Sequence, residues 1–406
     1  MRSQWFTVGM AISLSAATFA SPIGSEMEQP WRGTDANGKA IPLDYNYGLN
    51  LDTGSNVETA VLQHPWSGSW WWTKSGSVAV RWRTALVWSA DHQYKDWPSY
   101  DQSDSMTYQP FSADDLAKMS EDQIRESTSA IEKLDIVNGR ADVRLWSSDP
   151  AKNGYYSNLG SVRGFVEGIV RENPKQLSYH GLCHGFSQAS IWLPEPKAVV
   201  IPVTYTLSDG STKTIRVPFG SGDLKALATY FYGQRTYTRN SNMNMIGSNE
   251  AAMNPAGFHL LLMNLTATDG KSFVVDTTPG DTVWNYPVWK FKMSTSRAYA
   301  ASSSYDPNVT QAVNVATDVT YMQTSNPTQN ELPEITREYG DDPSIGYDRL
   351  ETHRKYSYTL ELNSGGRIVG GYWNGGPQAD FAWTLKKAIP FDGEYAILSK
   401  YWQAAR

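Results

Sequence analysis

The sequence predicts an α+β protein in which a helix-rich lobe is followed by a lobe of antiparallel strands, with a cleft between the two. Helical signals gather between residues 112 and 233, whereas strand-like segments separated by Ser-, Thr- and Asn-rich loops follow from residue 258 onward. The composition is that of a globular protein, because 40% of the 406 residues are hydrophobic and 19% are charged.

The first residues have the charge, length and cleavage chemistry of a secretory signal peptide. Arg2 supplies a positive start, a short apolar stretch follows, and Thr18 and Ala20 place small residues before a cleavage point that ends a signal of residues 1–20. No later segment has the ~18 continuous apolar residues that a membrane helix needs. We therefore expect a secreted protein without a membrane anchor.

The rest of the chain divides by composition. Residues 21–60 are polar and rich in turn-forming residues, which is typical of a leader or of a pro-segment that covers another part of the protein. The folded region is expected to cover residues 61–400, with the helix-rich lobe at about 61–240 and the sheet-rich lobe at about 241–400.

The clearest helical segment covers residues 112–135. Ser120 and Gln123 form a capping-box pattern within it, and we interpret its charged residues as a solvated outer face. Two further helices are expected at residues 183–193, before a Pro-rich stop, and at residues 223–233, between an acidic start and a glycine end.

Strands are expected where apolar residues alternate or run together between turn signals. A hairpin is predicted at residues 198–207 and 212–217. The remaining strands are predicted at residues 258–265, 272–277, 313–321, 356–362 and 367–373, and the longest loop at about 294–312.

Charge and cysteine content exclude several classes of function. Lys and Arg number 35 against 41 Asp and Glu, which leaves a net charge of −6, and no basic run exists. Binding to nucleic acid or to an anionic membrane therefore has little support. The single cysteine excludes an internal disulfide framework, zinc ribbons, Fe–S clusters and CxxC redox centres.

The lone cysteine, Cys183, lies at the expected N-terminus of a helix. Unpaired backbone N–H groups and the positive end of the helix dipole favour a thiolate there, which is what a nucleophilic cysteine needs. His259 and Asp276 are candidates for its base and for the group that orients the base. If their two segments formed a hairpin with an even loop, both side chains would project from one face of the sheet.

Each of these residues also has a structural interpretation: Cys183 as a buried apolar side chain, His259 as a core histidine and Asp276 as a turn carboxylate. His180 and His184 are alternative bases, although no strand carboxylate follows either of them. With Cys183 they also resemble metal ligands, but three ligands within five residues give poor zinc geometry, and we predict no metal site.

Several segments between about residues 60 and 390 carry a resemblance to a known family. They are Pro65–Gly68 with the tryptophans that follow, Gly181–Gly185 continuing to Lys197, Asp223–Leu227, Asn254–Asn264, Phe273–Asp276, Gly370–Trp373 and Asp380–Trp383. At these residues the sequence resembles the transglutaminase elicitor family, which comprises secreted cell-wall transglutaminases of plant-pathogenic oomycetes and bacterial relatives.

The most specific segment is Val283–Lys292, which resembles the surface peptide that plants perceive in the oomycete enzymes. Tyr286 and Trp289 depart from the Gln and Arg that the family usually has at these places. Perception by plants is therefore not implied for this chain.

The resemblance implies a cysteine-enzyme core of the papain-like or transglutaminase type, with the active site in the cleft between the lobes. It implies a protein-glutamine γ-glutamyltransferase, which joins glutamine and lysine side chains of proteins or peptides through a Cys183 thioester. Cys183, His259 and Asp276 would form its catalytic triad. Water in place of a lysine or another primary amine would give deamidation.

Further residues take supporting roles in this interpretation. The backbone N–H of Cys183 is the natural oxyanion donor, and Gln176 is a candidate second donor. Trp70–Trp72, Trp284 and Trp289 are candidates for a tryptophan wall that keeps water from the acceptor site, and Trp284 and Trp289 are the candidates for binding substrate. Packing is the simpler explanation for most of these tryptophans.

The chemistry requires no cofactor, although the resemblance suggests calcium dependence. No EF-hand loop is present. A cluster of carboxylates offers either a weak calcium site or plain solvation of a loop: Asp341, Asp342, Asp348 and Glu351.

Two other functions stay open at this point. A papain-like cysteine peptidase or amidase would use the same three residues, so the sequence does not separate it from a transglutaminase. A protein with 16 Trp and 23 Tyr could also be a non-enzymatic wall- or glycan-binding protein with Cys183 buried.

Overall fold

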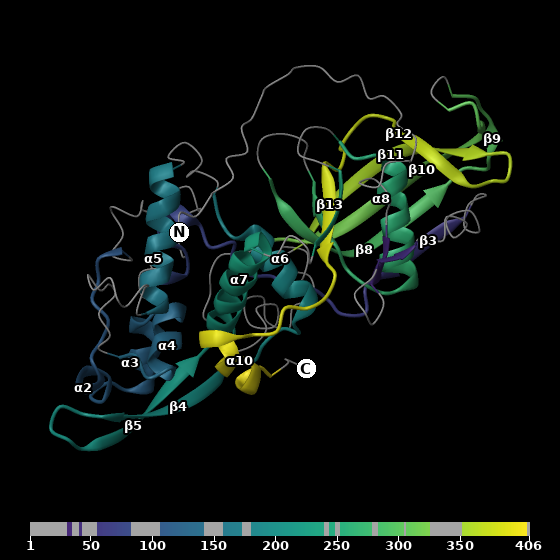
Figure 1. Cartoon of the computed structure of the whole chain (residues 1–406). Coiled ribbons are helices and arrows are strands. Elements are labelled where there is room, and N and C mark those ends of the chain that lie inside the picture. Colours follow the sequence, from purple (N-terminus) through teal and green to yellow (C-terminus); the bar gives the residue numbers. More distant parts are fainter. Residues whose placement is uncertain are drawn as a thin grey trace.

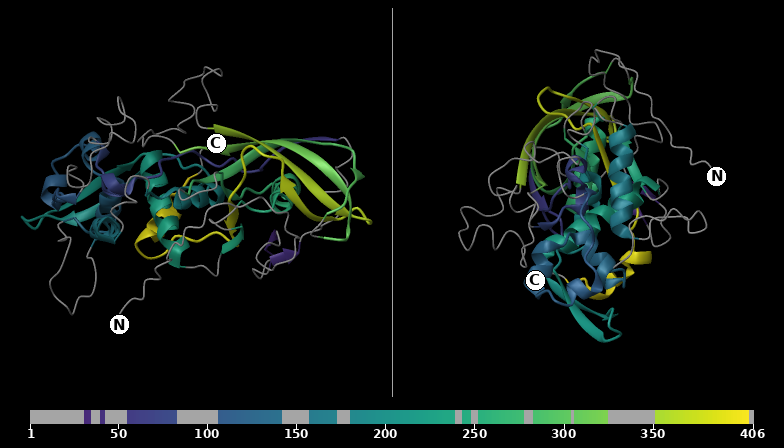
Figure 2. Two further views of the ribbon diagram at one scale, coloured as in Figure 1. Left: turned by 90° about the horizontal axis from the view of Figure 1, so that it is seen from above. Right: turned by 90° about the vertical axis from the view of Figure 1, so that its left-hand side faces the viewer.

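The computed structural model describes residues 31–34, 40–42, 55–82, 106–141, 157–172, 180–238, 243–247, 252–277, 283–303, 306–324 and 351–403. The molecule is elongated, with most helices at one end and an antiparallel sheet at the other (Figure 1), and the left view of Figure 2, seen from above, shows the same division. The mixed helical and antiparallel architecture confirms the coarse fold class. The papain-like core and the cleft stay predictions.

The described helices are the following. They are α2 (Ala113–Leu116), α3 (Glu121–Ser127), α4 (Ala130–Val137), α5 (Asn158–Glu172), α6 (Cys183–Trp192), α7 (Ser221–Thr238), α8 (Pro255–Leu261) and α10 (Ala396–Tyr401). Short 3-10 turns cover Thr73–Ser75, Ser77–Ala79 and Gly393–Tyr395, and α8 continues into a π-helical stretch over Leu262–Thr268. The helix expected to begin at Cys183 is confirmed.

Residues 112–135 fold into three short helices rather than one. Ser112, Ser120 and Ser129 each accept a hydrogen bond from the backbone N–H three residues later, and the side chain at that position accepts one from the serine backbone N–H. The capping box predicted at Ser120 is therefore confirmed. Because each serine caps the start of a new helix, the segment is divided into α2, α3 and α4.

The charges of this segment are not all on a solvated face, as the sequence analysis expected. Lys133 and Asp223 are fully buried and form a salt bridge of 2.6 Å between α4 and α7. The indole N–H of Trp82 donates to the other carboxylate oxygen of Asp223. A buried charge is tolerated only where it is paired and hydrogen-bonded, and this network meets both conditions.

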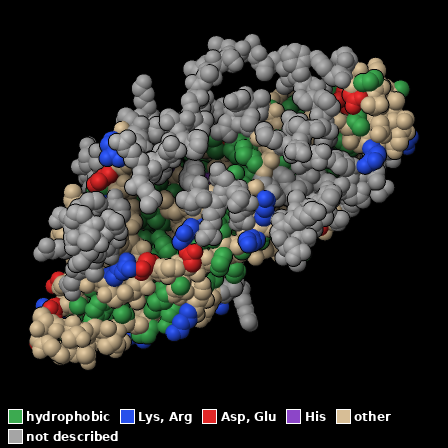
Figure 3. Space-filling view, viewed as in Figure 1, with side chains coloured by type: hydrophobic (Ala, Val, Ile, Leu, Met, Phe, Trp, Pro, Cys, Tyr) green, Lys and Arg blue, Asp and Glu red, His purple; other side chains and the backbone are tan. Residues whose placement is uncertain are grey.

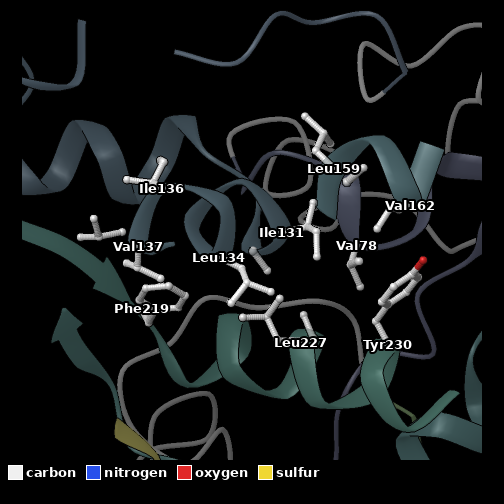
Figure 4. Close-up of a cluster of buried hydrophobic side chains, with 14 of the residues drawn as sticks. Val78, Ile131, Leu134, Ile136, Val137, Leu159, Val162, Phe219, Leu227 and Tyr230 are labelled. Atoms are coloured by element: carbon white, nitrogen blue, oxygen red, sulfur yellow. The ribbon is translucent and has the colours of Figure 1, made fainter. Parts of the chain in front are cut away.

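The core of the helix-rich lobe lies where α4, α5 and α7 meet, and Figure 4 shows ten labelled members of this cluster. Helix α7 is longer than the expected 223–233, and Gly233 lies inside it rather than at its end. A side chain on Gly185 would bring its Cβ within 2.1 Å of the Thr229 carbonyl oxygen. Glycines at this crossing therefore let α6 and α7 approach closely.

The large sheet has a central path of strands with two short strands beside it. The path is β12 (Ile368–Trp373), β11 (Glu351–Asn363), β10 (Val309–Met322), β8 (Asn285–Thr295), β7 (Val274–Asp276), β13 (Phe381–Leu385) and β6 (Met243–Gly247), with β3 (Asn56–Ala60) pairing β8 and β9 (Tyr299–Ala300) pairing β10. Separate two-stranded sheets are β1 (Trp31–Thr34) with β2 (Ala40–Pro42), and β4 (Val199–Thr206) with β5 (Thr212–Phe219). The second of these is the predicted hairpin.

The strands predicted near residues 272–277, 313–321, 356–362 and 367–373 are confirmed as β7, β10, β11 and β12. The strand predicted at residues 258–265 is wrong, because this segment is α8 with its π-helical continuation. Asn254 caps the helix by accepting from the Ala256 N–H, and Pro255 occupies its first turn.

The register assigns the side chains of the sheet to two faces. Asp276 pairs with Asn285, and Trp383 with Val274, so these side chains share one face, which we name the α6 face because it packs against α6. The intervening Val275 and Ala382 point the other way, to what we name the α8 face, where α8 packs.

The chain crosses between the lobes more than once. Strand β3 joins the sheet before the helices begin, and α10 returns at the end, where Leu398 enters the core of the helix-rich lobe. Arg140, three residues after the end of α4, forms a salt bridge with Glu394 in this returning segment. The lobes are therefore interleaved along the chain.

On the face shown in Figure 3, the described Lys and Arg side chains are interspersed with Asp and Glu rather than gathered in one basic patch. Among the residues that the structure describes, no helix combines the length and apolar character that crossing a membrane requires.

Candidate active site

Cys183 is the first residue of α6 and is almost fully buried, with 9% of its surface exposed. Its backbone is held on both sides. The N–H of the preceding Leu182 donates to the Trp70 carbonyl at 2.6 Å, and the Ser187 hydroxyl is 2.8 Å from the Cys183 carbonyl and 2.7 Å from the Asn285 carbonyl. These bonds fix the start of α6 against β8.

The α6 face presents Asp276 and Asn285 to this helix start. They are register partners at the ends of β7 and β8, and they are 0% and 5% exposed. The Asn285 side-chain nitrogen lies 3.5 Å from the Cys183 sulfur. Asp276 accepts from the Trp284 N–H at 3.3 Å, and its charge acts on the pKa of Cys183. The predicted nucleophile and the predicted acidic residue are thus brought together.

Hydrogen-bond donors and burial shift the pKa of the Cys183 thiol in opposite directions. Burial, the largest influence, raises the pKa of the Cys183 thiol, and the negative charge of Asp276 raises it further. The Asn285 side chain and the backbone N–H groups of Asn285 and His184 lower that pKa, because they donate to the thiolate. The thiol faces the Val283 carbonyl oxygen at 3.9 Å.

Tryptophans enclose the sulfur. Trp70, Trp72 and Cys183 form one buried cluster, and the half-buried Trp284 packs against it. The rings of Trp70 and Trp72 are stacked at 6.1 Å between centroids, and those of Trp70 and Trp284 lie 5.5 Å apart. Sequence reasoning associated these tryptophans with the site, and the structure places all three at the cysteine.

Two backbone features hold Trp70 and Trp72 in place beside the sulfur. Trp71 has a φ of 46°, in the left-handed region that non-glycine residues rarely adopt, and its ring packs on Trp82 in the helix-rich core instead. A Cβ on Gly181 would lie 2.3 Å from the Trp70 ring, so only glycine fits at that position. The strained turn sends Trp70 and Trp72 to one side and Trp71 to the other.

The structure does not bring His259 to Cys183. His259 belongs to α8, on the opposite face of the sheet, and is 2% exposed. Its Nδ1 is hydrogen-bonded to the Tyr358 hydroxyl at 3.0 Å, and its Nε2 has no hydrogen-bond partner among the described residues. Burial alone lowers its pKa to about 4. The hairpin that was expected to align His259 with Asp276 does not exist, so its catalytic role stays a prediction without this support.

The two histidines that flank the cysteine are engaged elsewhere. The His180 ring is hydrogen-bonded to the Thr73 hydroxyl at 2.8 Å, and burial lowers its pKa. The His184 ring lies 3.3 Å from the Gly233 carbonyl oxygen, and burial lowers its pKa to about 4. Their rings therefore do not converge with the sulfur on a common point.

The remaining predicted residues lie apart from the sulfur or outside the described residues. Trp289 packs edge-on against His64 at 4.2 Å, with the Lys290 ammonium 3.8 Å from its ring centre. Gln176 and most of the carboxylate cluster lie outside the described residues. Within the part of the chain that the structure describes, no group of three or more His, Cys, Asp and Glu side chains could hold a metal ion.

A comparison with protein-family models matches residues 97–392 to the family described as transglutaminase elicitor. The chain belongs to the transglutaminase elicitor family. The match includes Cys183, Asp276, Asn285 and Trp383, and it confirms the resemblance inferred from the sequence.

Comparison with solved structures finds similarity to the crystal structure of the GP42 transglutaminase from Phytophthora sojae. The two are 22% identical, with a TM-score of 0.48, over 85% of this chain and 90% of that chain. A search of curated proteins finds no match. Family membership rests on the family match.

Sequence reasoning missed two residues of this family member's site. Asn285 contacts the sulfur, and the Trp383 indole N–H donates to the Asn285 side-chain oxygen at 2.7 Å. Both lie in segments that carry the resemblance: Asn285 follows Trp284, and Trp383 ends the segment that begins at Asp380. The available signal was therefore their place within those segments, but residue type alone gives no reason to select an Asn or a Trp.

Proposed function

We propose that this family member is a protein-glutamine γ-glutamyltransferase that works through a thioester on Cys183. The observation that carries the proposal is the convergence of Asn285, the first turn of α6 and the charge of Asp276 on the thiol of the chain's one cysteine. These are the groups that activate a nucleophile and stabilise an oxyanion. Family membership supports the reaction class.

In the first half-reaction, the Cys183 thiol gives its proton to the Asp276 carboxylate, and the thiolate attacks the side-chain carbonyl carbon of a glutamine. The oxyanion that forms accepts hydrogen bonds from the Cys183 backbone N–H and from the Asn285 side chain. The C–N bond then breaks, and the proton on Asp276 leaves with the nitrogen as ammonia. A γ-glutamyl thioester remains on Cys183.

In the second half-reaction, a lysine amine or another primary amine attacks the thioester carbon and gives its proton to Asp276. The C–S bond breaks, an isopeptide bond forms, and the sulfur recovers its proton from Asp276. Asp276 serves as the proton carrier in this proposal because its charge acts on Cys183, whereas His259 lies on the other face of the sheet.

The tryptophans give the transfer its advantage over hydrolysis. Trp70, Trp72 and Trp284 surround the sulfur with apolar surface, which limits the access of water to the thioester. An amine that carries an alkyl chain can replace water against the indole rings, because its methylene groups gain contact there. Substrate binding by Trp284 belongs to this proposal, and Trp289 is left as a more distant candidate.

The direct test is incorporation of a fluorescent primary amine into casein by the purified protein. We expect incorporation that Cys183→Ala abolishes, together with release of ammonia. Cleavage of casein to new α-amino termini without incorporation of amine would instead identify a cysteine peptidase. Neither activity, before and after limited proteolysis of the N-terminal segment, would favour a binding protein.

Calcium dependence and secretion are parts of the proposal that need separate measurements. Of the candidate calcium ligands only Glu351 is described, and its carboxylate lies 3.5 Å from the Lys290 ammonium, so it is already paired. We assign calcium no step. The same assay with calcium and with a chelator tests the requirement, and N-terminal sequencing of the exported protein tests cleavage after residue 20.

A further inference from the structure

A hydrogen-bonded chain links a buried tryptophan to the nucleophile through one amide. The indole N–H of Trp383 donates to Asn285 Oδ1 at 2.7 Å, and Asn285 Nδ2 lies 3.5 Å from the Cys183 sulfur. The Trp383 and Asn285 side chains are 3% and 5% exposed, so water cannot easily take over either bond. The three residues come from β13, β8 and α6.

The orientation of the Asn285 amide determines whether its nitrogen or its oxygen faces the Cys183 sulfur. An asparagine side chain has an accepting oxygen and a donating nitrogen of nearly equal size, and rotation by about 180° exchanges them. An indole N–H is a donor only, so it holds the oxygen on its own side and leaves the nitrogen to point at the sulfur. With the amide reversed, its oxygen would face a thiolate and repel it.

The fold leaves little freedom in this chain. Trp383 is register partner to Val274 on one side and to Met245 on the other, so its backbone is fixed in the sheet. The Asn285 backbone is fixed by its pairing with Asp276 and by the Ser187 hydroxyl on its carbonyl oxygen. Rotation of the Asn285 amide is therefore the main degree of freedom that remains, and the hydrogen bond from the Trp383 indole fixes it.

We propose that Trp383 is a positioning residue for the nucleophile, because its indole N–H holds the Asn285 amide with the N–H group toward the Cys183 sulfur. The inference rests on the proposed function for its catalytic meaning. The thiol chemistry that it predicts can be measured without any acyl transfer.

The first experiment measures the ionisation of Cys183 in Trp383→Phe. Because Cys183 is the only cysteine, the ultraviolet absorbance of its thiolate can be titrated directly, with the Cys183→Ala profile subtracted to remove the tyrosines. Loss of a hydrogen bond to a charged group changes an equilibrium by about tenfold, so the midpoint rises by about one pH unit. In the transfer assay, kcat falls by about tenfold and KM changes little.

Two controls separate positioning from packing. Trp373→Phe removes another buried indole, whose N–H donates to the Met253 carbonyl at 2.8 Å in the α8-side core, and we expect it to leave the Cys183 midpoint unchanged. Replacing Trp383 with a benzothienyl analogue keeps the size of the ring and removes only the N–H. That protein should show the same rise in midpoint that is expected of Trp383→Phe. It also provides the test if Trp383→Phe fails to fold because its ring is smaller.

A double-mutant cycle with Asn285→Ala gives the decisive result. Without the amide, Trp383 has nothing to orient, so Trp383→Phe should shift the midpoint by less than about 0.3 pH unit in that background, which is a factor of about two in the ionisation equilibrium. The proposal is overturned if the midpoint shifts equally with and without Asn285, or if the benzothienyl protein titrates like the wild type. Absence of acyl transfer in the wild type, with the expected cycle intact, would refute the proposed function but leave this inference standing.

Discussion

Cys183 and His259 are both buried in helices that pack on the same sheet, but they lie on opposite faces of it. Around Cys183, polar groups converge from α6, β7 and β8 on one sulfur atom. Around His259, the Tyr358 hydroxyl is the one polar partner among the described residues, and the surrounding side chains are apolar. The first arrangement resembles a reaction centre, and the second resembles a core histidine with one ring nitrogen hydrogen-bonded.

This difference shows why a triad should be judged by its surroundings rather than by the residue types alone. Burial lowers the pKa of His259 to about 4, and no charged group contributes to that shift. A histidine that serves a cysteine in catalysis usually has a carboxylate to stabilise its imidazolium form. Here the nearby carboxylate, Asp276, acts on the cysteine instead.

The largest expected effect is on the sulfur itself. Cys183→Ala should reduce amine incorporation by at least about a thousandfold, because the covalent route is lost. The thermal midpoint should hardly change, since alanine fits in place of a small buried side chain. A variant with more than a tenth of the wild-type rate would show that the chemistry lies elsewhere in the chain.

The next effect distinguishes a proton carrier from a charge that merely lies nearby. Asp276→Asn should lower the pKa of Cys183, because it removes a negative charge beside the thiolate. The rate of transfer should nevertheless fall by about a hundredfold, as expected for loss of a general acid and base. A lower thiol pKa with an unchanged or faster rate would exclude Asp276 from proton transfer.

His259→Gln should affect stability rather than chemistry. Folded His259 stays neutral down to about pH 4, whereas an unfolded histidine takes up a proton below about pH 6.5. The unfolded state therefore binds more protons in this window, and wild-type stability falls by about 3 kcal/mol from this residue as pH falls from 6.5 to 4. The variant lacks that loss.

Urea unfolding of both proteins at pH 7 and pH 4.5 measures this effect. The pKa of His64 and His184 is also lowered to about 4, but both residues remain in the variant, so the difference between the two proteins isolates His259. The variant should have a lower free energy of unfolding than the wild type at pH 7, and this difference should be smaller at pH 4.5. Its transfer rate should stay within about twofold of the wild-type rate. A hundredfold loss of transfer in a folded variant would restore His259 as the base.

The sequence predicted the helix and the strand that carry Cys183 and Asp276, because the signals for both were local. Pro194 and the pattern around Cys183 located helix α6, and the apolar run that ends at Asp276 located β7. The run Phe258–Leu262 was ambiguous, because a short apolar run fits a strand or a buried helix equally well. Asn254 and Pro255, a helix cap and a first-turn proline, were the signal that would have decided it.

The contacts that complete the site depend on tertiary register. Asn285 meets Cys183 and Trp383 only because β7 and β13 pair in the order that the sheet shows, across 98 residues in the case of Trp383. No local pattern encodes that pairing. The same holds for Lys133, whose charge was assigned to a solvated face, whereas α4 and α7 bury it together with Asp223.

The smallest expected effect tests the His259 side of the comparison at a single atom. Tyr358→Phe removes the hydroxyl bonded to His259 Nδ1 and leaves that ring nitrogen buried without a partner, which should cost about 1–2 kcal/mol of unfolding free energy. Tyr321→Phe is a matched control, because its hydroxyl bonds Tyr356 on the same face without touching the histidine. Both variants should transfer amine at the wild-type rate. If Tyr358→Phe alone slowed transfer while the control did not, the hydrogen bond to His259 would be serving the reaction, and the two faces of the sheet would be coupled in catalysis.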